Sequence, residues 1–152
     1  MKMKAIILVL MIGMQLNACS KNENPLQADT RDSSSNTTKM KITVGSSVFT
    51  AVLYDNPSAS AFEARLPLTI NMTELNGNEK YYDFPSPLPT NALAGGNMKV
   101  GDLTLYGNNV LVLFYKNFNT SYSYTKLGYV DNPTGLAHAL GAGNVTVKFE
   151  NN

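Results

Sequence analysis

The sequence predicts a mainly β domain, folded as a closed β-barrel of about eight strands with two short capping helices. Three observations predict it. Apolar and polar residues alternate in short segments, as they do in half-buried strands. Asn-Gly and similar pairs separate these segments, which is typical of hairpin turns. Only two stretches have helical spacing, and both are short.

The domain opens with a predicted hairpin. Ile42 and Val44 alternate with polar residues up to a Gly-Ser-Ser turn, and residues 48–53 form the returning strand. A helix follows, because Asn56 suits the cap position and Pro57 suits the first helical position. Its apolar face and the proline that ends it are Ala59, Phe62, Leu66 and Pro67.

The middle of the domain holds a second hairpin and a long loop. The first strand ends at Asn76-Gly77, a strong turn signal, and residues 80–84 form the second strand. The apolar positions of the first strand are Leu68, Ile70 and Met72. Residues 85–96 read PSPLPTNALAGG, and their proline and glycine content predicts a loop. Loops of this length without regular structure are often functional.

The last part of the domain contributes four strands and a helix. Residues 103–106 and 110–115 flank a Gly-Asn-Asn turn and form a hairpin. The second of these strands is a continuous apolar run, which indicates burial on both faces. Residues 125–130 and 145–149 are predicted strands, and a short helix over Gly135–Leu140 separates them.

The N-terminus predicts a lipid anchor. Lys2 and Lys4 precede an apolar run of signal-peptide length, too short for the roughly 20 residues of a membrane-spanning helix. Leu-Asn-Ala-Cys follows at 16–19 and looks like the bacterial lipobox. Residues 1–18 are therefore predicted to be a lipoprotein signal peptide, with Cys19 as the lipidated residue. The alternative is an ordinary secretory signal that leaves Cys19 free.

The anchor divides the chain into three parts. Residues 19–39, which follow the signal peptide, offer almost no apolar side chain to bury, so we predict a lipidated cysteine and a flexible tether. Residues 40–152 are predicted to be the folded domain. We expect an exported protein of the cell envelope, anchored to a lipid bilayer and facing the periplasm or the cell surface.

The composition excludes several classes of function. The chain has 12 Lys and Arg against 11 Asp and Glu, so no basic excess favours nucleic acid as a partner. Cys19 is the only cysteine, which leaves no disulfide or redox chemistry in the domain. His138 is the only histidine, so no His- or Cys-rich metal site is expected, and no cofactor. We interpret His138 as an ordinary, partly exposed helix residue.

Aromatic residues supply the candidate binding site. All 8 tyrosines lie in the domain, and several flank a loop rich in Asn, Thr and Ser between Tyr115 and Tyr122. Tyrosine combines an apolar face with a polar tip, which suits peptide or glycan contact. The alternative is that alternate aromatic residues fill the barrel core. The predicted groove is lined by Tyr82, Phe84, Phe114, Tyr115, Tyr122 and Tyr124.

Three stretches resemble a family of bacterial cyclophilin-like domains. They read PLTINMTELNGNEKYYDFP, GDLTLYG and LFYKNFNTSYSYTKLGYVDNPTGLAHALGAGNVTVKFE. The resemblance spans about 40–150 and implies a cyclophilin-like β-barrel capped by two helices.

True cyclophilins are prolyl isomerases, and the resemblance implies an arginine that contacts the substrate carbonyl and the prolyl nitrogen. The corresponding stretch, 81–102, contains no arginine, glutamine or histidine, and its only cation is Lys99. The two arginines of the mature chain lie elsewhere, Arg31 in the predicted tether and Arg65 on the predicted first helix. Without this residue most electrostatic catalysis is lost.

The sequence thus predicts a membrane-anchored, non-catalytic binding module for a peptide, glycan or small ligand. One alternative is a weak peptidyl-prolyl isomerase that uses Lys99 or a backbone donor. A second alternative is a structural subunit of a surface complex, with the barrel wall as its interface.

Overall fold

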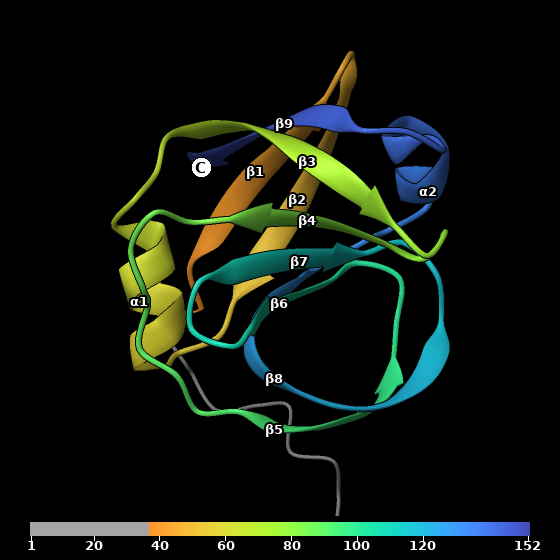
Figure 1. The fold of residues 1–152 in the computed structure, drawn as a ribbon. Coiled ribbons are helices and arrows are strands. Elements are labelled where there is room, and N and C mark those ends of the chain that lie inside the picture. The colour runs from red at the N-terminus through yellow and green to blue at the C-terminus, as the bar shows by residue number, and fades with distance from the viewer. Residues whose placement is uncertain (1–36) are drawn as a thin grey trace, which may run out of the picture. The chain divides into compact units, whose positions relative to one another are not determined.

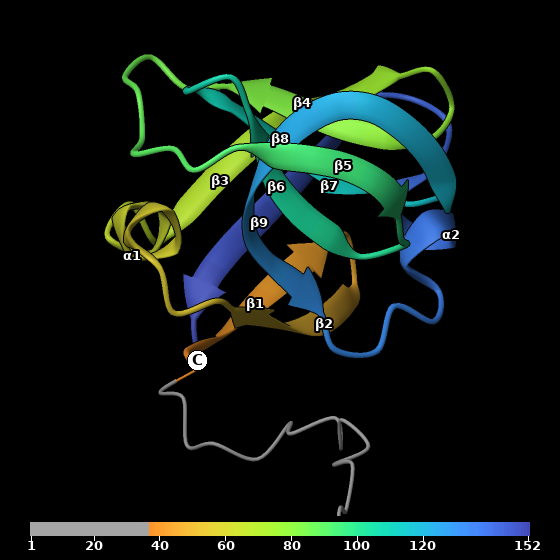
Figure 2. The same ribbon diagram turned by 90° about the horizontal axis from the view of Figure 1, so that it is seen from below.

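The computed structural model describes residues 37–152. Within them, eight antiparallel strands close into a ring, and a ninth strand pairs outside it (Figures 1 and 2). The ring runs β2, β1, β9, β3, β4, β7, β6, β8 and back to β2. In chain order the elements are β1 (Lys39–Val44), β2 (Ser47–Leu53), α1 (Pro57–Glu63), β3 (Leu68–Leu75), β4 (Glu79–Asp83), β5 (Leu93–Met98), β6 (Asp102–Tyr106), β7 (Val110–Phe114), β8 (Phe118–Val130), α2 (Leu136–Leu140) and β9 (Val145–Asn151).

The predicted mainly β barrel with two short helices is confirmed. Each predicted hairpin turn carries residues with positive φ, as at Asn76 and Gly77, whose φ values are 55° and 69°. Asn56 caps α1 as predicted, because its side-chain oxygen accepts a hydrogen bond from Ala59 N at 2.9 Å. The predicted signal peptide (1–18), the lipidation site Cys19 and the predicted tether up to residue 36 lie outside the described residues.

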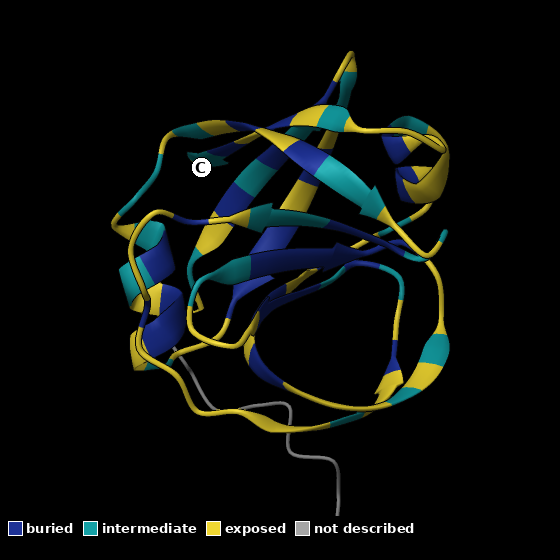
Figure 3. Cartoon of the chain, in the orientation of Figure 1, coloured by how far each residue is buried: buried dark blue, intermediate teal, exposed yellow. Residues whose placement is uncertain are grey.

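The core fills the inside of the ring, and the helices cover its ends. Buried residues alternate with exposed ones along β1, β3 and β9 (Figure 3). Phe62 of α1 is fully buried and packs on Phe149 and Phe84, with ring centroids 5.8 Å and 6.4 Å apart. Leu136 and Leu140 fix α2 to the core. Neither helix within 37–152 is long or apolar enough to span a bilayer.

The predicted two-sided burial of the apolar run in β7 is confirmed. Leu111 and Leu113 belong to the main core inside the ring. Val112 and Phe114 belong to a second cluster on the outer face of the sheet, together with Met98 and Tyr124. The outer face of β7 is therefore covered by other parts of the chain, and this covering builds the candidate site.

Three predicted boundaries are wrong. Residues 93–96, predicted as loop, belong to β5, and β8 begins at Phe118 rather than at Thr125. The first helix ends at Glu63, so Leu66 and Arg65 follow the helix instead of lying on it. The two strand errors have one cause, because β5 and the first half of β8 pair with each other. Such pairing over distance in the chain overrides local composition.

Glycine in β5 marks a close contact rather than a turn. A Cβ atom at Gly95 would lie 2.7 Å from the side chain of Thr120 and 2.9 Å from the carbonyl oxygen of Tyr122. Gly128 plays the same part where β8 meets β2, since a Cβ there would lie 2.3 Å from the carbonyl oxygen of Val52. Both glycines let β8 approach its neighbours closely.

A lysine is buried inside the barrel. Lys80, the second residue of β4, is fully buried, and its ammonium pairs with the carboxylate of Glu74 on β3. The same ammonium donates hydrogen bonds to the carbonyl oxygens of Gly141, at 2.8 Å, and Gly143, at 2.6 Å. These partners meet the condition under which a charge can be buried. Lys80 therefore joins β4, β3 and the segment between α2 and β9.

Glu74 completes this cluster. It accepts hydrogen bonds from the Tyr115 hydroxyl at 2.8 Å and from Gly77 N at 2.7 Å. Burial acts to raise the pKa of Glu74, but the hydrogen bonds from Lys80, Tyr115 and Gly77 outweigh it and hold this pKa below its ordinary value. Burial and the Glu74 carboxylate raise the pKa of Tyr115 to about 12. At neutral pH, Glu74 is therefore ionised and Tyr115 protonated.

Removing the buried ammonium should destabilise the barrel strongly. Lys80→Ala leaves Glu74 without its counter-ion and two carbonyl groups without their donor, so we expect the free energy of unfolding to fall by about 3 kcal/mol. Lys80→Met fills the space without the charge and should lose less. Urea unfolding followed by circular dichroism measures both. The control is Lys148→Met, which removes a half-exposed lysine paired with Glu150 and should leave stability nearly unchanged. Equal losses for Lys80→Ala and Lys148→Met would contradict a structural role for Lys80.

Candidate functional site

The first half of β8 leaves the ring and forms a wall outside it. β8 pairs with β6 from Tyr124 to Tyr129 and with β5 from Phe118 to Tyr124. Tyr124 pairs with residues of both strands, so β5 and β6 lie on opposite edges of β8. Over 119–123 the edge on the β6 side therefore has no strand partner among the described residues. Figure 2 shows β8 and β5 curving together across the β4 and β7 side of the barrel.

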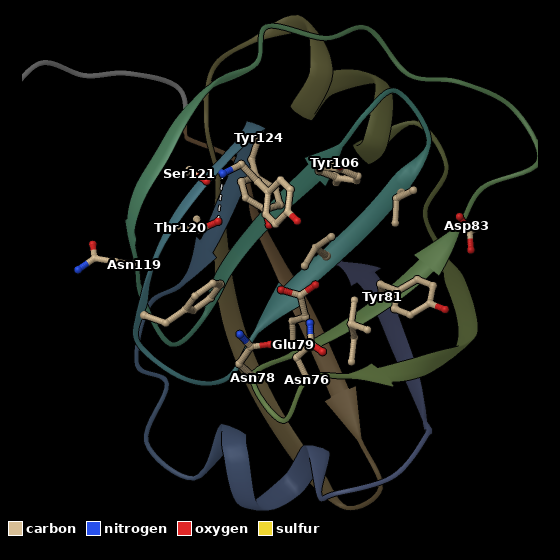
Figure 4. Close-up of a pocket in the computed structure, with 15 residues that line it drawn as sticks. Asn76, Asn78, Glu79, Tyr81, Asp83, Tyr106, Asn119, Thr120, Ser121 and Tyr124 are labelled. Carbon is tan, nitrogen blue, oxygen red and sulfur yellow. Dashed lines mark hydrogen bonds between the residues drawn. The ribbon is translucent and has the colours of Figure 1, made fainter.

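A concavity of about 600 Å³ lies between this wall and the outer face of the barrel (Figure 4). We call it the outer concavity. Its lining residues come from the end of β3 and the turn after it, from β4, β6 and β7, and from the first half of β8. They are Leu75, Asn76, Asn78, Glu79, Tyr81, Asp83, Tyr106, Val110, Val112, Phe118, Asn119, Thr120, Ser121, Tyr122 and Tyr124.

Strand alternation decides which side chains reach the outer concavity. Successive residues of a strand point to opposite faces. Because Lys80 and Tyr82 point into the barrel, Glu79, Tyr81 and Asp83 of β4 face outward and line the concavity. The same alternation in β7 sends Leu111 and Leu113 to the core and Val110 and Val112 outward.

Glu79 is the buried charge of the outer concavity. Its residue is 8% exposed, and its carboxyl points into the space that the lining residues enclose (Figure 4). Burial, and after it the negative charge of Glu74, raises the pKa of Glu79 above its ordinary value. Among the described residues no hydrogen-bond donor contacts this carboxyl. The lining contains a second carboxylate, Asp83, but no lysine, arginine or histidine.

Aromatic rings in edge-on and tilted contact form one side of the outer concavity. Tyr106 contacts Tyr122 and Tyr124, with centroids 5.9 Å and 5.6 Å apart. Tyr124 packs edge-on against Phe114 at 5.4 Å, and Phe114 packs against Phe118 at 5.3 Å. Burial, followed by the charge of Glu79, raises the pKa of Tyr124 to about 12. The Tyr124 hydroxyl therefore stays protonated across the physiological range.

The structure places the six residues of the predicted groove on two different faces of the sheet. Tyr122, which is 62% exposed, lies at the rim of the outer concavity, and Tyr124 lines it. Phe114 lies fully buried beneath Tyr124. The remaining three face the barrel interior on the other side of the sheet; they are Tyr82, Phe84 and Tyr115. The six do not form one groove, and the ligand-binding role of those at the concavity stays a prediction.

The residues that sequence reasoning missed are Glu79, Tyr81, Tyr106 and the polar group around Asn78. The sequence did contain a signal for Glu79 and Tyr81, namely the alternation of residues along their strand. Phe84, which belongs to the predicted groove, is an apolar strand residue that suits the core, and strict alternation from it sends Tyr81 and Glu79 to the outer face. The covering of that outer face by β8 had no local signal, so these residues looked like ordinary surface residues.

Other candidate residues lie away from the outer concavity. Lys99 follows β5, and its backbone N–H donates to Asp102 at 2.9 Å. His138 is exposed on α2. Arg65 donates to Ser86 and Pro87 and lies over the Phe84 ring at 4.5 Å, which ties down the loop after β4. Within residues 37–152 no group of three or more His, Cys, Asp or Glu is placed to hold a metal ion.

Comparison with known proteins gives a family and a fold. A model described as the cyclophilin-like family matches residues 42–150. No curated protein matches the chain. A hypothetical protein from Archaeoglobus fulgidus, solved in solution, has a similar structure with a TM-score of 0.57 and 17% sequence identity. The match covers 76% of this chain and 95% of that one, and at this identity it shows the fold alone.

Neutralising Glu79 should stabilise the free protein. Its pKa is raised in the folded state, so ionisation weakens the fold as the pH rises through that folded-state value. Glu79→Gln removes this titration. We expect no gain at about pH 3 and a gain of about 1 kcal/mol at about pH 7. Thermal unfolding at both pH values measures it.

The matched control is Asp83→Asn, a change of an exposed carboxylate on the same strand and the same face. It should leave the unfolding temperature nearly unchanged at either pH. A Glu79→Gln variant that is no more stable than the wild type at neutral pH would show that the carboxyl is well solvated.

Proposed function

Since the chain belongs to the cyclophilin-like family, we propose that it is a membrane-anchored, non-catalytic binding module whose ligand occupies the outer concavity. The main support for this proposal is the concavity itself. Its volume of about 600 Å³ falls within the range of roughly 300–1,000 Å³ that is usual for ligand sites. Apolar and aromatic side chains with a few converging polar groups line it, which is also usual for such sites.

The unpaired edge of β8 supports an extended peptide as ligand. Residues 119–123 have β5 on one edge and no strand on the other, and the second edge borders the outer concavity. A peptide added along such an edge gains main-chain hydrogen bonds, while nearby pockets select its side chains. The aromatic residues around Tyr106 supply such contacts. A compact small ligand would use these rings without the edge.

A binding role is favoured over prolyl isomerisation by the charge of the lining. Isomerisation of the kind that the resemblance implies needs a cation at the substrate carbonyl. The lining of the outer concavity has Glu79 and Asp83 and no cationic side chain, and Lys99 is not among the lining residues. A protease-coupled assay with a proline peptide tests the isomerase alternative, and a rate above that of buffer would revive it.

Binding should depend on Tyr122. We expect at least one member of a panel of fluorescein-labelled hexapeptides and immobilised glycans to bind, and Tyr122→Ala to weaken that binding about tenfold. Tyr122 is largely exposed, so its truncation leaves the core intact. The control is Tyr129→Ala, which removes a partly exposed tyrosine outside the concavity. Equal affinities of wild type and Tyr122→Ala for every bound ligand would place the site elsewhere.

The anchored location rests on the signal-peptide pattern and on Cys19. Fatty-acid labelling of cells that produce the protein should label the wild type, and Cys19→Ser should abolish the label and release the protein into the soluble fraction. The loss follows because Cys19 is the only thiol in the chain. Unlabelled, soluble wild-type protein would favour the ordinary secretory signal instead.

A further inference from the structure

We propose that the ligand of the outer concavity presents a protonated amine that binds the carboxyl of Glu79. The proposal rests on the proposed function, since it concerns the ligand of the same concavity. The lining favours a primary ammonium group attached to an apolar or aromatic segment. Such a group occurs in a lysine side chain of a peptide and in a small free amine.

Glu79 has the geometry of an unoccupied acceptor. Its residue is more than nine-tenths buried, it lines the outer concavity, and its carboxyl points into the enclosed space (Figure 4). No donor among the described residues satisfies it. Next to it, the side-chain oxygen of Asn78 is buried and accepts no hydrogen bond. This end of the concavity therefore offers acceptor atoms to which no protein donor is bound, whereas buried acceptors are normally satisfied.

No cation of the protein neutralises Glu79. Lys80 is its neighbour in the chain, but its ammonium points to the opposite face and is held by Glu74 and two carbonyl groups. The acidic groups near Glu79 are Glu74, whose negative charge acts from the other face of the sheet, and Asp83, which lies farther along the same face of β4. A positive ligand would relieve their repulsion, while a negative ligand would add to it.

The aromatic lining suits a cation as well. The phenols that line the concavity from β6 and β8 belong to Tyr106, Tyr122 and Tyr124, and the raised pKa of Tyr124 keeps its hydroxyl protonated and uncharged at neutral pH. The face of an aromatic ring attracts a cation within about 6 Å of its centroid. Their apolar faces also cover the hydrocarbon part of the ligand. A metal ion is a poorer fit, because no group of three or more ligating side chains gathers within 37–152.

Ionisation of Glu79 weakens the free protein, because burial raises the pKa of its carboxyl. Groups that destabilise a fold and face a cavity are candidates for function. When an ammonium binds, the carboxylate gains a charge-assisted hydrogen bond in a site of low dielectric constant. The ionised Glu79 therefore destabilises the free protein, and an ammonium ligand would offset that destabilisation in the complex.

The test uses the intact chain and two pairs of probes. The peptide pair is Ac-Gly-Phe-Lys-Phe-Gly-NH₂ and its acetyl-lysine counterpart. The small-molecule pair is 2-phenylethylamine and 2-phenylethanol. Titration calorimetry should give at least tenfold tighter binding for the amine of at least one pair. The pair that shows the preference identifies the source of the ammonium group.

Glu79→Gln should remove the preference for the amine, and Asp131→Asn, which changes an exposed carboxylate outside the concavity, should keep it. The preference should also fall as the pH is lowered through the raised pKa of Glu79, whereas Glu79→Gln should show no such pH dependence. Because Glu79→Gln removes an unpaired charge, the variant is expected to fold, and thermal unfolding verifies this.

Two outcomes overturn the inference and differ in what they say of the proposed function. Equal binding of amine and neutral probe, weakened by Tyr122→Ala for both, leaves the outer concavity as a binding site and refutes the ammonium. The same holds if Glu79→Gln keeps the preference. No binding by any probe or by any member of the peptide and glycan panel overturns the proposed function together with the inference.

Discussion

The buried ammonium of Lys80 is the interaction on which the rest of the structure depends. A charge inside a barrel is tolerated only where acceptors surround it, and here Glu74, Gly141 and Gly143 supply them. This requirement fixes the register of β4, because a shift by one residue would carry Lys80 to the outer face and leave the acceptors unpaired. With the register fixed, Glu79 and Tyr81 must face outward. The inner ion pair thus determines the lining of the outer concavity.

The two glutamates at the end of the second hairpin have opposite environments. Glu74 is surrounded by donors, and its pKa lies below the ordinary value. Glu79 has no donor, and burial together with the charge of Glu74 raises its pKa. Both carboxylates lie close to the same turn, yet one is satisfied by the protein and the other is not. A purely structural role accounts for Glu74 but leaves Glu79 without a partner, which is why the proposed ligand is sought there.

The sequence predicted the elements whose signals are local. Asn56 caps its helix, and Asn76-Gly77 closes its hairpin, because the geometry of each depends on a few adjacent residues. It did not predict β5 or the start of β8, where pairing between 93–98 and 118–124 overrides a loop-like composition. The six aromatic residues of the predicted groove lie on different faces of the sheet for the same reason. Alternation separates inner from outer faces, but only the path of β8 decides which outer residues are enclosed.

The double use of β8 couples the site to the integrity of the barrel. One continuous strand holds β2 and β6 together at Gly128 and forms the wall of the outer concavity from Phe118 to Tyr124. Local opening of a ring begins at a short pairing, and β2 meets β8 over three residue pairs, as few as join β3 to β4. A ligand held by the wall would resist that opening, and amide hydrogens in β2 would exchange more slowly although β2 does not touch it. Release of such a ligand and local opening of the barrel would then be linked.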